Sequence, residues 1–315
     1  MTDPQYERFI ARKPIYEVAA SEVKGRQWPL MTYVSDKQIP EAGLRVDLGW
    51  IYEVPRPNLP TPEQVLDYDQ LLVHIGMDPA KPQDLGATIE LSLGGQLIVF
   101  NTTTAIFIPK GIPYRLPIWQ EVSRPHVQLS IVLGSGDPYS VPGKKVAPEA
   151  ATVGAALSER GIVSAETGGL DFEQYVVRSP IREAGPDRVE GRQNPTMTYM
   201  SGTQVPGVKH YLEIGWIWEA PNRAIPRMRH DNYDEVVVHL GSDPDHPEDL
   251  GATMRFDVGD ELAEFDTTHC VFLPRELNHG PLIWKEVRRP MLEIATMLGA
   301  GTWAEGWEGS FFDES

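Results

Sequence analysis

Short apolar segments separated by turn sequences run through both halves of the chain. Val, Ile, Leu, Trp, Tyr and Phe dominate these segments, which favours β-strands, and Gly-, Pro- and Asp-containing stretches such as SGTQVPG and DVGDE predict the turns. Strands are expected at Thr196–Met200, Tyr211–Trp218, Glu235–Leu240, Ala252–Val258, Ala263–Phe265, Cys270–Leu273, Leu282–Lys285 and Met291–Leu298, with first-half equivalents that include Ala87–Leu93, Gln96–Phe100 and Ala105–Ile108. Many short, closely spaced strands predict an all-β sandwich or barrel.

The two halves of the chain also repeat each other. GRQWPLMTYVS at 25–35 returns as GRQNPTMTYMS at 191–201, and YDQLLVHIGMDP at 68–79 returns as YDEVVVHLGSDP at 233–244. A duplication of this period predicts two copies of one folding unit, each with its own core. It also provides an internal control. Residues that agree between the halves serve the fold, and chemical differences point to a site that one half lacks.

The duplication divides the chain into two tandem domains, expected at residues 1–137 and 169–315. A linker is expected between them at 138–168, where PEAATVGAALSER at Pro148–Arg160 is rich in Ala and Glu and predicts a short helix. The acidic and aromatic tail at Gly301–Ser315 either lies across a barrel or remains mobile.

Composition narrows the class of protein. The chain has 315 residues, 41% of them apolar, which is enough for two cores, and a net charge of −17. That charge disfavours nucleic acid and anionic membranes as partners, because both bind clustered Lys and Arg. The single cysteine, Cys270, excludes an internal disulfide and is interpreted as a core residue. Without a signal pattern or a long apolar run, we expect a cytoplasmic protein.

Three side chains in the second half form a candidate metal site. His230 and Glu235 precede or begin one predicted strand, and His279 follows another, so the three could converge inside a closed sheet. Two imidazoles and one carboxylate with open positions suit Fe(II), Mn(II), Ni(II) or Zn(II).

These residues carry a resemblance to a known family. RHDNYDEVVVHLG resembles the first cupin motif, and PRELNH resembles the second, P-x-G-x-x-H. The whole protein resembles a two-domain cupin, or bicupin, over roughly residues 25–135 and 191–300. The resemblance implies two jelly-roll barrels of the double-stranded β-helix type, one ligand pocket per barrel, metal ligands at His230, Glu235 and His279, and association into a homodimer.

The motifs depart from the family pattern at two positions. The first His of the first motif falls on Met228, and the Gly of the second motif falls on Glu276, so the ligand set has three members instead of four.

The comparison of matching positions shows that the two barrels differ at the candidate metal ligands. His230, Glu235 and His279 correspond to Val65, Gln70 and Tyr114, so the first barrel lacks all three candidate ligands.

Other histidines have different interpretations. His239 is matched by His74 in the other half and lies about 13 Å along a strand from Glu235, so it is interpreted as a buried structural residue. Candidate substrate-binding residues are His210, which replaces Leu44, Arg229, whose charge attracts a carboxylate or phenolate, and His269, which replaces Thr104.

Two classes of function remain open. The first is a metal-dependent enzyme acting on a small keto/enol or aromatic substrate, with a dioxygenase as first choice and an isomerase or lyase next. Its cofactor would be Fe(II), or else Mn(II), Ni(II) or Zn(II). The alternative is a non-catalytic bicupin that binds a small molecule, since fold alone does not assign activity.

Overall fold

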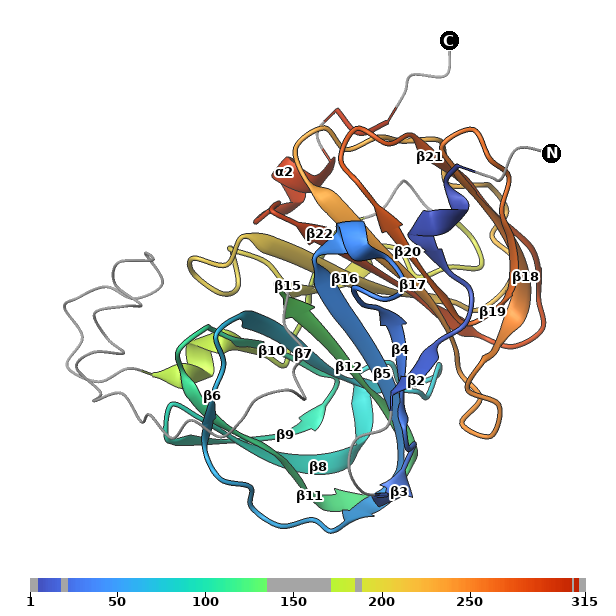
Figure 1. Ribbon diagram of the computed structural model, residues 1–315. Coiled ribbons are helices and arrows are strands. Elements are labelled where there is room, and N and C mark those ends of the chain that lie inside the picture. The colour runs from blue at the N-terminus through green and yellow to red at the C-terminus, as the bar shows by residue number, and fades with distance from the viewer. Residues whose placement is uncertain (1–4, 18–21, 135–170, 185–188, 308, 312–315) are drawn as a thin grey trace.

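A computed structural model describes residues 5–17, 22–134, 171–184, 189–307 and 309–311. The chain forms two β-barrels that lie side by side (Figure 1), which confirms the predicted all-β class. The expected linker at 138–168, with its helix at Pro148–Arg160, lies outside the described residues.

Each barrel is built from a large antiparallel sheet facing a smaller one. The strands of the first barrel are β2 (Ile15–Glu17), β3 (Lys24–Arg26), β4 (Leu30–Val34), β5 (Leu44–Arg56), β6 (Gln64–Val65), β7 (Asp69–Gly76), β8 (Asp84–Leu93), β9 (Gln96–Thr102), β10 (Thr104–Ile108), β11 (Pro113–Val122) and β12 (His126–Leu133). Its sheets run β13-β10-β7-β12-β5-β4-β2, where β13 is Val176–Val177 and β3 lies beside β5, and β6-β11-β8-β9.

The second barrel repeats this order. Its strands are β14 (Ile181–Ala184), β15 (Thr196–Met200), β16 (His210–Ile217), β17 (Asp234–Gly241), β18 (Asp249–Val258), β19 (Glu264–Thr267), β20 (His269–Leu273), β21 (His279–Val287) and β22 (Met291–Leu298). Its sheets run β1-β20-β17-β22-β16-β15-β14, where β1 is Ile10–Ala11, and β19-β18-β21. The helical elements within the described residues are short: η1 (Glu7–Phe9), η2 (Pro40–Ala42), η3 (Phe172–Tyr175) and α2 (Trp303–Trp307).

The burial pattern of each strand follows from what covers it. β18 alternates buried and half-buried residues over Met254–Val258, as expected where one face of a sheet packs on the core. β17 is buried from Glu235 to Gly241, because the large sheets carry a barrel interior on one face and the neighbouring barrel on the other. The apolar core of the first barrel therefore continues into the second through residues such as Tyr199 and Trp216.

The beginnings of the two repeats are exchanged between the barrels. β1 (Ile10–Ala11) pairs with β20 of the second barrel, whereas β13 (Val176–Val177) pairs with β10 of the first. The ring of Phe172 lies directly against Gly94 of the first barrel, so closely that an added Cβ would overlap the ring. The exchange ties each barrel to the chain of the other.

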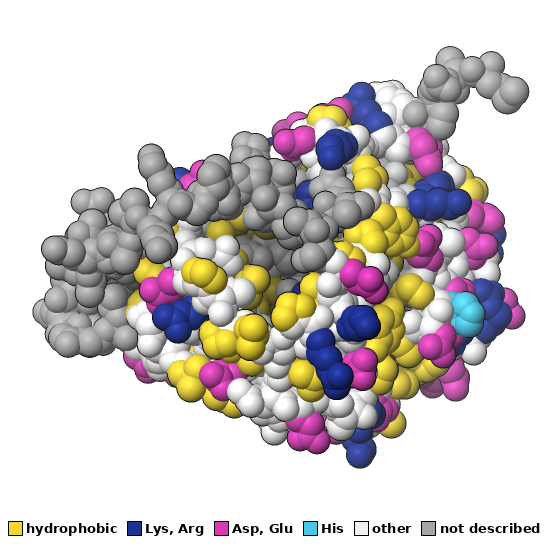
Figure 2. All heavy atoms as spheres, turned by 60° about the horizontal axis from the view of Figure 1, so that its bottom comes forward, with side chains coloured by type: hydrophobic (Ala, Val, Ile, Leu, Met, Phe, Trp, Pro, Cys, Tyr) yellow, Lys and Arg dark blue, Asp and Glu magenta, His cyan; other side chains and the backbone are white. Residues whose placement is uncertain are grey.

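The described surface carries mixed charge. On the face in Figure 2, acidic and basic side chains are scattered among hydrophobic ones, and the basic groups do not gather into one patch. Among the described residues, no helix is long and apolar enough to cross a membrane.

Candidate metal centre

The three candidate ligands come together at one end of the second barrel. Glu235 is the second residue of β17, and His279 begins β21. His230 precedes β17 in a segment held against β21, because the backbones of Met228 and His279 exchange two hydrogen bonds of 2.9 Å. The carbonyl of His230 also accepts a 2.7 Å bond from the N–H of Glu276.

The turn before His279 has an unusual backbone. Glu276 has a φ of 66°, in the left-handed region that glycine adopts without strain. It stands at the motif position where glycine is expected, and the first barrel keeps Gly111 there with a φ of 84°. The sequence departure therefore leaves the turn geometry intact.

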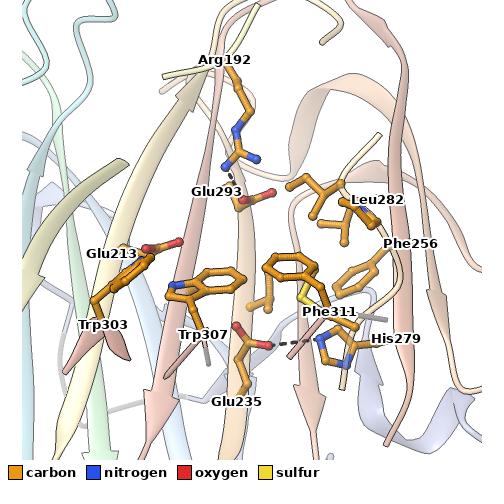
Figure 3. Close-up of a pocket in the computed structure, with 15 residues that line it drawn as sticks. Arg192, Glu213, Glu235, Phe256, His279, Leu282, Glu293, Trp303, Trp307 and Phe311 are labelled. Carbon is orange, nitrogen blue, oxygen red and sulfur yellow. Dashed lines mark hydrogen bonds and ion pairs between the residues drawn. The ribbon is translucent and has the colours of Figure 1, made fainter. Parts of the chain in front are cut away.

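Nitrogen and oxygen atoms of the three side chains face one another closely. Nε2 of His230 lies 3.2 Å from Oε2 of Glu235, and Nε2 of His279 lies 3.5 Å from the same oxygen. The three ligand atoms all lie within 4.8 Å of one another, and all three residues are buried. Figure 3 shows the Glu235 carboxylate and the His279 ring turned toward each other.

Hydrogen bonds on the far side of each ring fix which nitrogen carries the proton. Nδ1 of His279 lies 3.0 Å from the carbonyl of Leu277, which can only accept, so this nitrogen is the donor. Nδ1 of His230 lies 2.6 Å from the hydroxyl of Tyr233 and 3.0 Å from that of Ser310. Both hydroxyls donate to the carbonyl of Gly306, which leaves their oxygens as acceptors for the His230 N–H.

The Nε2 atoms therefore both present lone pairs toward a carboxylate. Neither Nε2 has a hydrogen-bond partner, although both are buried. Lone pairs aimed at an anionic oxygen repel unless a positive charge lies between them, and buried polar atoms without partners are costly. The donor set of two imidazole nitrogens and one carboxylate oxygen thus fits a divalent metal ion.

The electrostatics of the trio agree with this arrangement. Burial alone would raise the pKa of Glu235, but positive charge placed at the two histidines outweighs burial and lowers that pKa below its ordinary value, so the carboxylate favours a cation at this position. Burial lowers the pKa of His279 to about 4, which keeps its ring neutral near neutral pH. An ionised carboxylate and neutral imidazoles are the forms that bind metal.

A cavity of about 120 Å³ opens beside the trio. Its polar lining consists of Glu235, His279, Glu213, Glu293 and Arg192. Its apolar lining includes Phe256, Leu282 and three aromatic residues of the C-terminal segment, namely Trp303, Trp307 and Phe311. The described part of the tail, up to residue 311, therefore lies across the mouth of the second barrel, the first of the two arrangements considered for it.

The other residues proposed to bind substrate do not line this cavity. His210 is half-buried at the start of β16. Arg229 lies 2.7 Å from Asp231 in a largely exposed ion pair. His269 is fully buried, and its ring stacks on Phe265 at a centroid distance of 3.7 Å. His239 is also fully buried, and its Nδ1 lies 3.0 Å from Nε2 of His269.

The first barrel has a different set of side chains at the matching positions. Gln70 donates a 2.7 Å hydrogen bond to Ser130, and Tyr114 is buried in the core. Val65 pairs with Pro113 at the edge of the small sheet. Among the described residues, the trio in the second barrel is the one group of His, Cys, Asp and Glu with ligand geometry.

Several site residues were missed in the sequence. Arg192 was overlooked because Arg26 stands at its matching position, so the comparison of the two halves shows no difference there. Glu293 differs in charge from its counterpart Gln128, and this difference could have identified it. Ser310 lies in the tail, where the repeat offers no counterpart for comparison.

Comparisons with known proteins concern the fold. No protein-family model and no curated protein sequence matches this chain. AerE from Microcystis aeruginosa is similar in structure, with 9% identity and a TM-score of 0.52 over 92% of this chain and 99% of its own. Oxalate decarboxylase from Bacillus subtilis has 10% identity and a TM-score of 0.54, over 86% of this chain and 72% of its own.

A further structure of that decarboxylase comes from a study of its Mn(II) centres and has 10% identity and a TM-score of 0.54, over 91% of this chain and 80% of its own. Identities this low concern architecture and leave activity open. Together with the two tandem barrels, these matches confirm the resemblance seen in the sequence: the chain has the two-domain cupin, or bicupin, fold.

Proposed function

We propose that the second barrel binds one divalent metal ion through His230, Glu235 and His279, and that the protein is a metal-dependent enzyme acting on a small keto/enol or aromatic molecule. The observation that carries the proposal is the convergence of two buried Nε2 lone pairs on one carboxylate. When bound, the metal would polarise a substrate oxygen or, as Fe(II), activate dioxygen.

The cavity walls favour a flat substrate. Trp307 and Phe311 stack on each other with ring centroids 5.4 Å apart, and both rings line the cavity. Aromatic walls exclude water and pack well against a planar conjugated molecule. In Figure 3 these rings lie between Glu235 and His279 on one side and Glu293 and Arg192 on the other.

Arg192 provides a binding group for a negative charge. Its Nη2 donates a 3.1 Å hydrogen bond to Glu293, but its Nε and Nη1 are buried and have no hydrogen-bond partner. A carboxylate or phenolate of the substrate would accept a charge-assisted hydrogen bond from one of these two donors. Arg192 would thereby orient the substrate across the cavity.

Glu213 adds a proton donor to the wall. Burial raises its pKa to about 8, although Arg192 opposes this effect. Its carboxyl group therefore carries a proton near neutral pH and can donate to a negatively charged substrate oxygen. Thr196 holds the carboxyl in place with a 3.0 Å hydrogen bond to Oε2.

Dioxygenase chemistry with Fe(II) is our first choice, followed by an isomerase or lyase with Mn(II), Ni(II) or Zn(II). Two-histidine, one-carboxylate sites with open positions are typical of Fe(II) oxygenases, which supports the first. The Mn(II) centres of the structurally similar oxalate decarboxylase support the second. Association into a homodimer and a cytoplasmic location remain predictions.

Metal analysis of the purified protein tests the proposal. After incubation with each ion, we expect about one metal per chain in the wild type and close to none in His279→Ala. The control is His246→Ala, which removes an exposed loop histidine and should keep the metal. A wild type that binds no metal under any condition would overturn the proposal and favour a non-catalytic small-molecule-binding bicupin.

If iron binds, oxygen consumption with a panel of enols and catechols decides the reaction class. Uptake of dioxygen that His279→Ala abolishes is the result expected of a dioxygenase. Substrate turnover without oxygen uptake would assign an isomerase or lyase instead.

A further inference from the structure

A row of hydrogen-bonded side chains, His269, His239 and Glu293, forms a second polar chain in the interior of the same barrel. Nδ1 of His269 lies 2.8 Å from the carbonyl of Thr267, and Nε2 of His269 lies 3.0 Å from Nδ1 of His239. Nε2 of His239 lies 3.3 Å from Oε2 of Glu293, whose Oε1 accepts from Arg192. Both rings are fully buried, and Glu293 lines the cavity.

The three contacts of this hydrogen-bonded chain require three protons, which is one proton more than two neutral imidazole rings supply. The contacts from Thr267 to His269, from His269 to His239 and from His239 to Glu293 each require one proton. The carbonyl and an ionised carboxylate supply none, and each neutral imidazole supplies one. Whichever tautomers are chosen, two neutral rings leave one contact with two facing lone pairs. A third proton must therefore reside on His239, on His269 or on Glu293.

Local charges indicate where that proton lies. Burial would raise the pKa of Glu293, but Arg192 and His239 together lower it below its ordinary value, so the carboxyl is ionised. Burial is the largest effect on His269 and lowers its pKa well below the ordinary value, so that ring is neutral. Because Glu293 also accepts from Arg192 and the Thr267 carbonyl takes the Nδ1–H of His269, the contacts place the third proton between His239 and Glu293.

This chain differs from the metal trio in its geometry. In the trio, two nitrogens converge on one oxygen and lack hydrogen bonds, which suits a cation. In the second chain, each contact joins one pair of atoms within hydrogen-bond distance, which suits a proton.

The first barrel lacks the proton-holding chain. Its matching residues are Thr104 for His269, His74 for His239 and Gln128 for Glu293. Neither ring nitrogen of His74 has a hydrogen-bond partner, and burial lowers the pKa of His74 well below its ordinary value. Both the metal trio and this chain are thus confined to one barrel, which links them to one function and not to the shared fold.

We propose that His239 and Glu293 form a proton reserve for the reaction, in which Glu293 is the general acid that faces the substrate and His269 is a positioning residue that keeps His239 charged. The proposal rests on the proposed function, because it assumes that the cavity holds a substrate.

The transfer step balances in protons and charge. The Nε2–H bond of His239 breaks as an O–H bond forms on Glu293, and the carboxyl passes a proton to a substrate carbon or oxygen that bears a lone pair. One proton leaves the chain, His239 becomes neutral, and Glu293 is again a carboxylate beside the positive charge of Arg192. The next proton comes from solvent or from the following substrate.

The surroundings of the pair contain both signs of charge. Arg192 faces Glu293 from the segment before β15, and the charge of Glu293 in turn acts to raise the pKa of Glu213 on β16 and of Glu235 on β17. His269 faces His239 from β20. The reserve therefore sits between one fixed cation and two acids that line the same cavity.

Nitrogen NMR of ¹⁵N-histidine-labelled, Zn²⁺-incubated protein tests the proton count without requiring a substrate. Near neutral pH we expect an imidazolium signature for His239 and a neutral His269. The variant Glu293→Gln places the first barrel's residue, glutamine, at this position. Its amide N–H would donate to Nε2 of His239, and its amide oxygen would accept from Arg192, so His239 should become neutral. His269→Ala, a second variant in case the first does not fold, removes one contact and should also make His239 neutral.

The outcomes are distinct. A neutral His239 together with an ionised Glu293 carboxyl in the wild type, read from ¹³C chemical shifts, would overturn the proposal. A protonated Glu293 would retain the third proton and support it. Metal content measured on the same samples separates the two proposals: wild type without metal but with the third proton contradicts the proposed function and leaves the reserve in place.

Activity, once a substrate is identified, provides the second arm. General acids contribute about 10²–10⁴-fold to rate. Glu293→Gln should therefore lower kcat by about 10²-fold or more, leave KM and metal content close to wild type, and remove one limb of the pH–rate profile. An unchanged kcat and pH profile would limit this chain to a structural role.

Discussion

The hydroxyl of Tyr233 offers a sensitive test of how the metal trio is positioned. It lies 2.6 Å from Nδ1 of His230 and donates to the carbonyl of Gly306, so it links the candidate ligand to the C-terminal segment. Tyr233→Phe removes this one oxygen and keeps the ring, which stacks on His230 at 4.6 Å. The Ser310 hydroxyl remains near both partners.

The magnitude follows from these contacts. Two hydrogen bonds are lost, each worth about 0.5–1.5 kcal/mol, and neither partner is left without another, so we expect about 1–2 kcal/mol lower free energy of unfolding. Loss of a group that orients a metal-binding histidine typically weakens metal affinity about 10–100-fold. Ser310 can still accept the His230 N–H, which favours the lower part of that range.

Competition with a chelator of known affinity measures the metal affinity of each variant. Urea unfolding of the metal-free protein measures the free energy of unfolding. The control is Tyr68→Phe at the matching position of the first barrel, which should leave metal affinity unchanged. If Tyr233→Phe loses stability but binds metal as tightly as the wild type, the claim that this hydroxyl orients His230 is wrong.

Three further predictions concern the fold and the cavity. Glu276→Gly should raise the free energy of unfolding by about 1 kcal/mol, because a left-handed backbone costs a non-glycine residue about that much, whereas Gly111→Glu should lower it by a similar amount; urea unfolding measures both, and equal stability of each variant and wild type would contradict the strain argument. The pKa of Glu213 is raised from its ordinary value of 4.5 to about 8, so its proton is held more tightly in the folded state. Its contribution to stability is therefore complete below the lower value and is lost as pH rises through the higher one. Urea unfolding near pH 6 and near pH 9 should show a smaller loss of stability in Glu213→Gln than in wild type, and identical pH profiles would refute the assignment. Phe172→Ala should cost about 3–5 kcal/mol, because a buried ring that fills the space over Gly94 is removed from the exchanged segment; thermal unfolding that matches wild type would show that the exchange does not stabilise the first barrel.

The positions of the strands were largely predictable from the sequence. Thr196–Met200 and Met291–Leu298 have the bounds expected from their apolar runs, and the other predicted strands differ from theirs by a few residues at the ends. These elements are local, since apolar periodicity and turn residues specify them without reference to distant contacts. The convergence of His230, Glu235 and His279 required the family resemblance in addition, because it depends on how strands close into a barrel.

The exchanged segments could not be predicted in the same way. YERFIARKPI and FEQYVVRSPI have the same pattern of apolar positions, so each fits the edge strand of either barrel equally well. Only the path of the chain in three dimensions decides between these pairings. The role of Ser310 was hidden for a related reason, since its contact with His230 spans 80 residues and depends on where the tail crosses the barrel.

Anomalous diffraction from crystals of the metal-incubated protein, recorded at the absorption edge of the bound ion, tests the central claim most directly. We predict one peak per chain, about 2.0–2.2 Å from Nε2 of His230, Nε2 of His279 and a carboxylate oxygen of Glu235. The absence of a peak there, or a peak at an exposed group such as His246 with Asp243, would contradict the account.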